Sequence, residues 1–241
     1  MTISNETRGR VKKIGEPIAL FFGRLGLTPD GLTLIGFAIT TIGAVLLALG
    51  MWIPGGLVVF AGAVFDMFDG TLARATGRVS RLGAFMDSVF DRCGEALVYV
   101  GLVWGTLDLG LSRPVVLAAA AMAAAFMVSY TRAKAEGLGF TSGTGMAAVG
   151  LAPREVRVVI LTIGLIVAGI LPGFPEDMDT PGALAYPPSA LALEAALGLI
   201  AILGTVTVIQ RILHTRAQAH APAAMATDAT NATQDPPGGV P

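Results

Sequence analysis

The length of the apolar segments constrains this chain more than any other feature. Six segments are long enough to cross a bilayer as helices, which takes about 20 residues; they lie near 31–51, 53–75, 83–107, 113–136, 155–172 and 189–213. Only 14% of the 241 residues are charged, whereas a soluble domain has about 25%. The sequence therefore predicts an all-α, polytopic membrane protein with six transmembrane helices.

The two ends of the chain differ from this apolar middle. Residues 8–26 begin with basic residues and end with apolar ones, a pattern typical of an amphipathic juxtamembrane helix that lies in the interface. Nothing in the first residues resembles a signal peptide, so we expect none. Residues 217–241 are rich in Ala, Thr and Pro, which favours a disordered cytoplasmic tail. We expect residues 1–216 to form the membrane domain.

The basic residues predict the orientation in the membrane. Of the 16 Lys and Arg residues, only Arg113 falls on one side of the predicted spans, and Glu176, Asp177 and Asp179 lie on that same side. The positive-inside rule then places both termini in the cytoplasm, and we expect an integral protein of the cell membrane. The net charge of −1 gives no basic field that would attract a nucleic acid.

Four aspartates lie close together in this apolar chain. Asp66 and Asp69 come near the cytoplasmic end of the second segment, and Asp87 and Asp91 near the start of the third. Spacings of three and four place each pair on one helical face, and the short connection makes the two helices antiparallel neighbours. A carboxylate at the centre of a spanning helix costs roughly 2.5–3.5 kcal/mol, so we expect other charges to offset these four.

Two kinds of cation can offset the aspartates. One alternative is a buried ion-pair network with Arg74, Arg78 and Arg92. The other is a pair of divalent ions. The chain has one cysteine and two histidines, which excludes a thiolate cluster and argues against a histidine site. Oxygen ligands alone point to Mg²⁺ or Mn²⁺, and two such ions suit a phosphoryl-transfer site. Glu95, one turn beyond Asp91, either orients ligands or pairs with an arginine, and both alternatives stay open.

The aspartates belong to a longer pattern, Asp66-x2-Asp69-Gly70-x2-Ala73-Arg74-x8-Gly83-x3-Asp87-x3-Asp91. At all its fixed positions this pattern resembles the motif of the CDP-alcohol phosphotransferase family, whose core also has six spanning helices and a juxtamembrane helix. The resemblance implies transfer of a phosphatidyl-type group from a CDP-linked lipid such as CDP-diacylglycerol to a small alcohol, with release of CMP. It also implies a homodimer.

The resemblance assigns roles to individual residues. It implies that the four aspartates are the ligands of the two metal ions and that Asp91 is also the general base for the acceptor hydroxyl. The contacts to the CDP-linked lipid that it implies are Asp30, Gly31, Leu32, Thr33, Gly70, Ala73, Arg74 and Ser80.

A second set of charges bears on the acceptor alcohol. Five basic residues are expected near the depth of the aspartates: Arg132, Lys134, Arg154, Arg157 and Arg211. An acceptor that carries a phosphate would need such cations, although the positive-inside rule alone would also place arginines there. The stretches YTRAKAE, GLAPREVR and VIQR are similar to those of prokaryotic phosphatidylinositol-phosphate synthases, except that Pro153 stands where an acidic residue is expected. This similarity implies inositol 1-phosphate, and glycerol 3-phosphate stays open.

Two rival functions remain possible on the sequence. A membrane transporter also uses intramembrane acids, but it would place them near mid-membrane and show repeated halves. Here the acids are expected near one face, and no internal repeat is visible. A non-catalytic, lipid-binding membrane subunit is the other rival. The full motif favours the enzyme.

Overall fold

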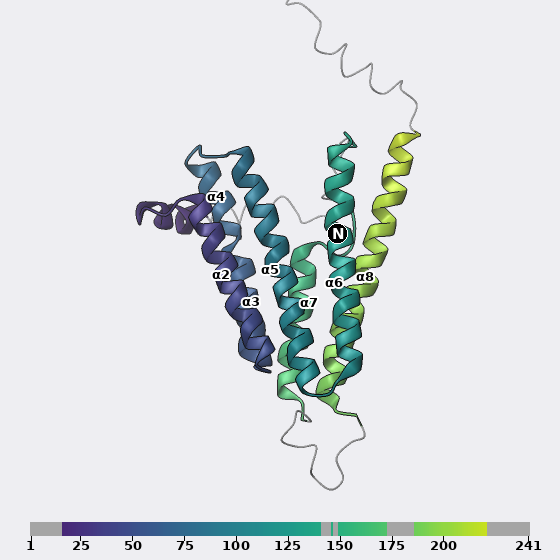
Figure 1. The fold of residues 1–241 in the computed structure, drawn as a ribbon. Coiled ribbons are helices and arrows are strands. Elements are labelled where there is room, and N and C mark those ends of the chain that lie inside the picture. Colours follow the sequence, from purple (N-terminus) through teal and green to yellow (C-terminus); the bar gives the residue numbers. More distant parts are fainter. Residues whose placement is uncertain (1–15, 141–145, 147–148, 173–185, 221–241) are drawn as a thin grey trace, which may run out of the picture.

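The computed structural model describes residues 16–140, 146, 149–172 and 186–220. Within these residues the fold is entirely helical (Figure 1). A helical segment at 16–24 precedes seven helices: α2 (Pro29–Ala48), α3 (Trp52–Phe65), α4 (Met67–Ala75), α5 (Arg81–Asp108), α6 (Ser112–Gly137), α7 (Arg154–Ile170) and α8 (Pro188–Ala219).

Four stretches of helix are long and apolar enough to cross a membrane among the residues described: Pro29–Ala48, Trp52–Ala75, Ser112–Gly137 and Pro188–Ala219. This confirms a helical membrane protein, while the count of six spans stays a prediction. The expected third span corresponds to α5, which carries five charged residues between Arg81 and Glu95. The expected fifth span corresponds to α7, which has 17 residues.

Several expected boundaries fall elsewhere or outside the described residues. The second predicted span is two helices, because α3 ends and α4 begins around Asp66. The last helix runs on to Ala219, three residues into the segment that the sequence assigned to the tail. The start of the predicted juxtamembrane helix (8–15) and the rest of the tail (221–241) lie outside the description.

α2 and α5 both begin with a side-chain cap, and their first turns lie in contact. The Thr28 hydroxyl accepts a hydrogen bond from the Gly31 N–H (3.1 Å), and the Ser80 hydroxyl accepts one from the Gly83 N–H (2.9 Å). Such caps satisfy N–H groups that have no partner within the helix. A methyl group at Gly83 would lie 3.3 Å from Asp30 Oδ1, so the first turns of the two helices are in contact.

The helices form two groups that meet in the middle of the molecule. In one, α2 packs on α3 and α5; in the other, α8 packs on α6 and α7. The groups meet where α3 contacts α7 and α5 contacts α6. Figure 1 shows the end of α4, the start of α5 and the ends of α6 and α8 at the same end of the molecule. The predicted catalytic region lies toward this end.

Candidate active site

The break between α3 and α4 places the first pair of aspartates. Asp66 is the residue between the two helices, and Asp69 lies in the first turn of α4. Gly36 on α2 makes room for Asp66, because a methyl group at position 36 would overlap the carboxylate oxygen Oδ1. Close approach of a neighbouring side chain is one reason for glycine within a helix. The side chain of Asp66 is therefore held against α2.

The second pair of aspartates faces the first from α5. Asp87 and Asp91 lie one helical turn apart. Asp66 interacts electrostatically with each of the other three carboxylates, and Asp87 does so with Asp69 and Asp91. The four predicted ligands therefore lie within electrostatic range of one another, where like charges repel.

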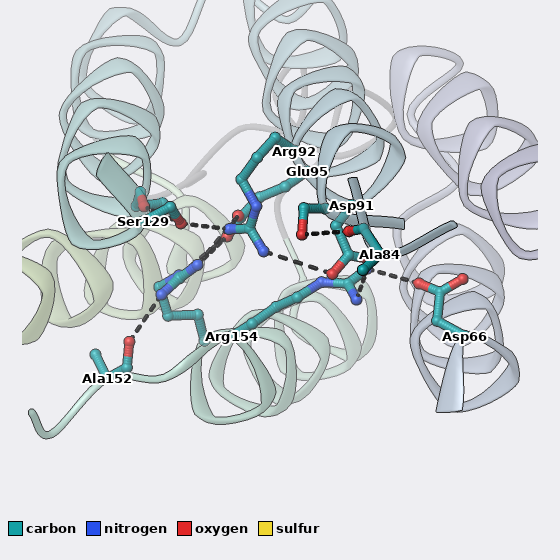
Figure 2. A network of polar contacts seen from close by, with 11 residues as sticks. Asp66, Ala84, Asp91, Arg92, Glu95, Ser129, Ala152 and Arg154 are labelled. Carbon is teal, nitrogen blue, oxygen red and sulfur yellow. Dashed lines mark hydrogen bonds and ion pairs between the residues drawn. The ribbon is translucent and has the colours of Figure 1, made fainter. Parts of the chain in front are cut away.

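A guanidinium group bridges two of these carboxylates. Arg154, the first residue of α7, places Nη2 2.8 Å from Asp66 Oδ2 and Nη1 2.6 Å from Asp91 Oδ1. Figure 2 shows its side chain reaching between the two aspartates. All three side chains are largely buried, with 12–20% of each exposed, so screening by water is weaker here than at a surface. Asp66 and Asp91 therefore converge on one cationic group.

Asp69 is held by two hydrogen bonds of its own. The Thr33 hydroxyl on α2 donates to Oδ2 (2.6 Å), and the Gly70 N–H donates to Oδ1. Only 6% of Asp69 is exposed. Thr33 was predicted to contact the CDP-linked lipid, and its hydrogen bond to Asp69 had no signal in the sequence because 36 residues separate the pair.

The donor set fits a hard divalent cation. The four ligands offer carboxylate oxygens only, as Mg²⁺ and Mn²⁺ prefer, and a positive group already links two of them. As the side chains stand, no three acidic, histidine or cysteine side chains among the described residues surround a single metal position. In the predicted role, Asp66, Asp69, Asp87 and Asp91 would hold the metal ions.

The predicted contacts to the CDP-linked lipid line the same region, with one exception. Asp30 and Ser80 meet at Gly83, and Arg74 lies along the glycine at position 70, since a methyl group there would be 3.3 Å from Nη1. Gly31 lies in the first turn of α2, and Ala73 on α4. Leu32 instead is fully buried in a small apolar cluster with Ala19 and Leu72.

The five basic residues predicted to hold the acceptor phosphate occupy different environments. Arg132 is exposed and pairs with Glu136 (2.9 Å), and Lys134 is exposed on the same helix. Arg154 contacts the aspartates. Arg157 and Arg211 are buried, with 2% and 4% exposed. The Arg211 guanidinium donates to the carbonyl oxygens of Val149 (3.0 Å) and Val128. Of these five residues, only Arg154 pairs with the aspartates.

The sequence left open whether Glu95 orients ligands or pairs with an arginine, and in the structure it pairs with two arginines. Its carboxylate accepts hydrogen bonds from Arg157 Nε (3.0 Å) and Nη2 (2.7 and 3.0 Å). It also pairs with Arg92 Nη1 (2.5 Å), and the same nitrogen donates to the Ser129 hydroxyl on α6 (2.7 Å). Figure 2 shows this network next to the bridge between Asp66 and Asp91.

Comparison with known proteins assigns this arrangement to a class of enzyme. The sequence model of the CDP-alcohol phosphatidyltransferase family matches residues 26–207, and the chain belongs to that family. It is therefore a transferase of phospholipid synthesis, which confirms the resemblance seen in the motif.

The relatives narrow the class. The chain is 38% identical to the archaetidylinositol phosphate synthase of Pyrococcus horikoshii over 159 residues, which is 66% of this chain and 80% of the relative. It is 35% identical to the phosphatidylinositol phosphate synthase of Mycolicibacterium smegmatis over 211 residues, covering 86% and 85% of the two chains.

Two solved structures of a phosphatidylinositol phosphate synthase are also similar to this chain. The crystal structure of the Mycobacterium tuberculosis phosphatidylinositol phosphate synthase with CDP-DAG bound matches with a TM-score of 0.69 and 30% identity, covering 84% of this chain and 94% of that one. The same enzyme in complex with manganese and citrate matches with a TM-score of 0.68 and 29% identity, covering 83% and 88%.

Proposed function

We propose that the protein transfers the phosphatidyl group of CDP-diacylglycerol to the hydroxyl of inositol 1-phosphate and releases CMP. The observation that carries this proposal is the bridge made by Arg154, which places a guanidinium beside Asp91, the predicted general base. A guanidinium binds a phosphate well. The names of the relatives and the CDP-DAG bound to the mycobacterial enzyme support both substrates.

In the proposed reaction, Asp91 takes the proton of the acceptor hydroxyl as its oxygen attacks the phosphorus of the phosphatidyl group. The bond from that phosphorus to the oxygen of the CMP phosphate breaks, and CMP leaves with the bonding electrons. The four aspartates would hold two divalent ions, whose positive charge would offset the negative charge of the pyrophosphate. Manganese in the mycobacterial structure supports this cofactor.

The remaining residues fall into two groups in this proposal. The residues of the CDP-lipid set at the start of α2, on α4 and at Ser80 hold the nucleotide diphosphate. Arg154 is the main cation for the acceptor phosphate, and Arg132, Lys134 and Arg211 add positive charge around it. The donors of Arg157 are already engaged by Glu95 and by the Ala152 carbonyl oxygen (2.7 Å), so the buried ion pair would have to break before Arg157 could contact a phosphate.

The proposal includes a placement in the membrane. Six spanning helices, an N-terminal interfacial helix and both termini in the cytoplasm would put the aspartates near the cytoplasmic face of the cell membrane. The clustering of basic residues at one end of the fold supports this orientation. A homodimer stays a prediction, which native mass spectrometry of the purified protein can test.

A CMP-release assay with purified protein, Mn²⁺ and CDP-diacylglycerol tests the function. The acceptor panel consists of inositol 1-phosphate, glycerol 3-phosphate, serine and unphosphorylated inositol. We expect release with inositol 1-phosphate and little with inositol, since the phosphate provides the contact to Arg154. Preference for glycerol 3-phosphate would make the protein a phosphatidylglycerophosphate synthase. Activity with serine alone would contradict the role of the cations. If none of the acceptors in the panel supported CMP release, a transporter or a lipid-binding subunit would be favoured.

A further inference from the structure

Two ion pairs connect α5 and α7 in successive helical turns. Asp91 and Glu95 are four residues apart on α5, and Arg154 and Arg157 are three apart on α7. Asp91 pairs with Arg154 (2.6 Å), and Glu95 pairs with Arg157 (2.7 Å). α5 packs on α2 and α6, while α7 packs on α3 and α8, and these two ion pairs connect α5 with α7.

The inner pair, Glu95 and Arg157, is buried and extensively hydrogen-bonded. Only 2% of the Arg157 side chain and 9% of Glu95 are exposed. Every guanidinium nitrogen of Arg157 donates a hydrogen bond: Nε and Nη2 to Glu95, and Nη1 to the Ala152 carbonyl oxygen. Ala152 lies just before α7, so the pair fixes both the first turn of the helix and the segment leading into it. Bidentate pairing of this kind sets geometry as well as charge.

The outer pair is more exposed than the inner pair. Arg154 is 19% exposed and Asp91 20%, and Arg154 borders a pocket that Glu95, Arg157 and Thr40 also line. The outer pair is therefore accessible to a ligand, whereas the buried inner pair connects α5 to the first turn of α7.

We propose that Glu95 is a positioning residue for the acceptor phosphate. It holds Arg157, which holds the first turn of α7, so that Arg154 reaches the place beside Asp91 where the phosphorylated alcohol binds. Glu95 also holds Arg92, which contacts Ser129 on α6, so one carboxylate ties three helices together (Figure 2). This inference rests on the proposed function.

The test removes both partners of the inner pair, while Arg92 keeps its contacts with Ser129 and with Asp91 (3.7 Å). Loss of one partner would leave the other uncompensated and destabilise the protein, whereas replacement of both by uncharged side chains of similar size is often neutral. In the double variant E95Q/R157M, we expect the KM for inositol 1-phosphate to rise about tenfold or more, comparable to the loss of one hydrogen bond to a charged group. The KM for CDP-diacylglycerol and the melting temperature should stay near those of the parent.

The matched control is R113M/E155Q, which removes one arginine and one acid elsewhere. Arg113 lies over the Tyr186 ring, 5.0 Å from its centroid, and Glu155 is exposed on the first turn of α7. This variant should keep both KM values. A second variant, E95D, keeps the charge on a shorter side chain, and its KM for inositol 1-phosphate should lie between those of the parent and the double variant.

Two outcomes would overturn the inference. One is a folded double variant with the parental KM for inositol 1-phosphate; the other, if the double variant does not fold, is E95D with the parental KM. Failure of the proposed function is detected separately, by assaying the parent enzyme with the acceptor panel. If the parent uses another phosphorylated acceptor, the variants are compared with that acceptor. If the parent uses no phosphorylated acceptor, both proposals are wrong.

Discussion

The two groups of helices carry opposite charges and differ in how their charged residues are arranged. In the group that contains α4 and α5, the four predicted metal ligands lie within electrostatic range of one another. In the group that contains α6, α7 and α8, five basic residues predicted to share one phosphate are distributed among an exposed surface, an aspartate bridge, a buried ion pair and a pair of backbone carbonyls. A short helical hairpin fixes relative positions by spacing alone, whereas residues on three separate helices depend on tertiary packing.

Removal of metal, which tests the group of helices that carries the aspartates, should have the largest effect on CMP release. The four carboxylates repel one another, and Arg154 bridges only two of them. After treatment with EDTA, we expect CMP release to fall to background and to return with Mn²⁺ or Mg²⁺. Mass spectrometry measures the metal content of the treated protein. Full activity in metal-free protein would show that the aspartates act without metal.

Replacement of the predicted base should come next. The substitution Asp91→Asn removes proton acceptance while keeping the side-chain shape, so CMP release should fall by about 10²- to 10⁴-fold. A thermal unfolding measurement on the same sample checks that the loss is not a loss of fold, since Asp91 also pairs with Arg154. Release at the parental rate would show that another group takes the proton.

A smaller effect is expected from the residue that joins the two groups. Arg154→Lys keeps the positive charge, but a single ammonium group lacks the two-pronged guanidinium with which Arg154 contacts both Asp66 and Asp91. We expect the KM for inositol 1-phosphate to rise about tenfold, while the KM for CDP-diacylglycerol changes less. Steady-state kinetics in which each substrate is varied separately distinguish the two. Equal increases in both values would argue against a specific role at the acceptor phosphate.

The smallest effect is expected at an exposed residue of the basic group. Lys134 lies on the surface of α6, where a single charge contributes up to about 1 kcal/mol. Lys134→Met should therefore change the KM for inositol 1-phosphate by less than about fivefold, and added salt should reduce the difference from the parent. An increase as large as that of Arg154→Lys would place Lys134 in direct contact with the phosphate.

The sequence predicted that the four aspartates lie near one another because the geometry involved is local. Spacings of three and four within two adjoining helices are sufficient to place Asp66, Asp69, Asp87 and Asp91 together. The break at Asp66 was not predicted, since the apolar pattern continues on its N-terminal side and no proline or glycine marks the position. The pairing of Glu95 with Arg157 depends on contact between residues 62 apart in the chain, and spacing carries no information about such a contact.

The basic residues show the limit of reasoning from charge. An arginine near the cytoplasmic end of a predicted span satisfies the positive-inside rule, binds a ligand or holds the fold, and composition does not distinguish these roles. Arg211 is an example: it is buried and donates to the Val149 carbonyl oxygen, so it connects α8 to the segment before α7. Its structural contacts became visible only when the helices were placed in space.

The glycine at position 36 gives α2 control over chemistry in which it supplies no metal ligand. The Asp66 carboxylate occupies space that is free because position 36 has no methyl group, and one added carbon would overlap and displace that carboxylate. An uncharged residue on a neighbouring helix thus determines how much space the Asp66 side chain has. A substitution at a position that supplies no predicted ligand can therefore still alter the aspartate site.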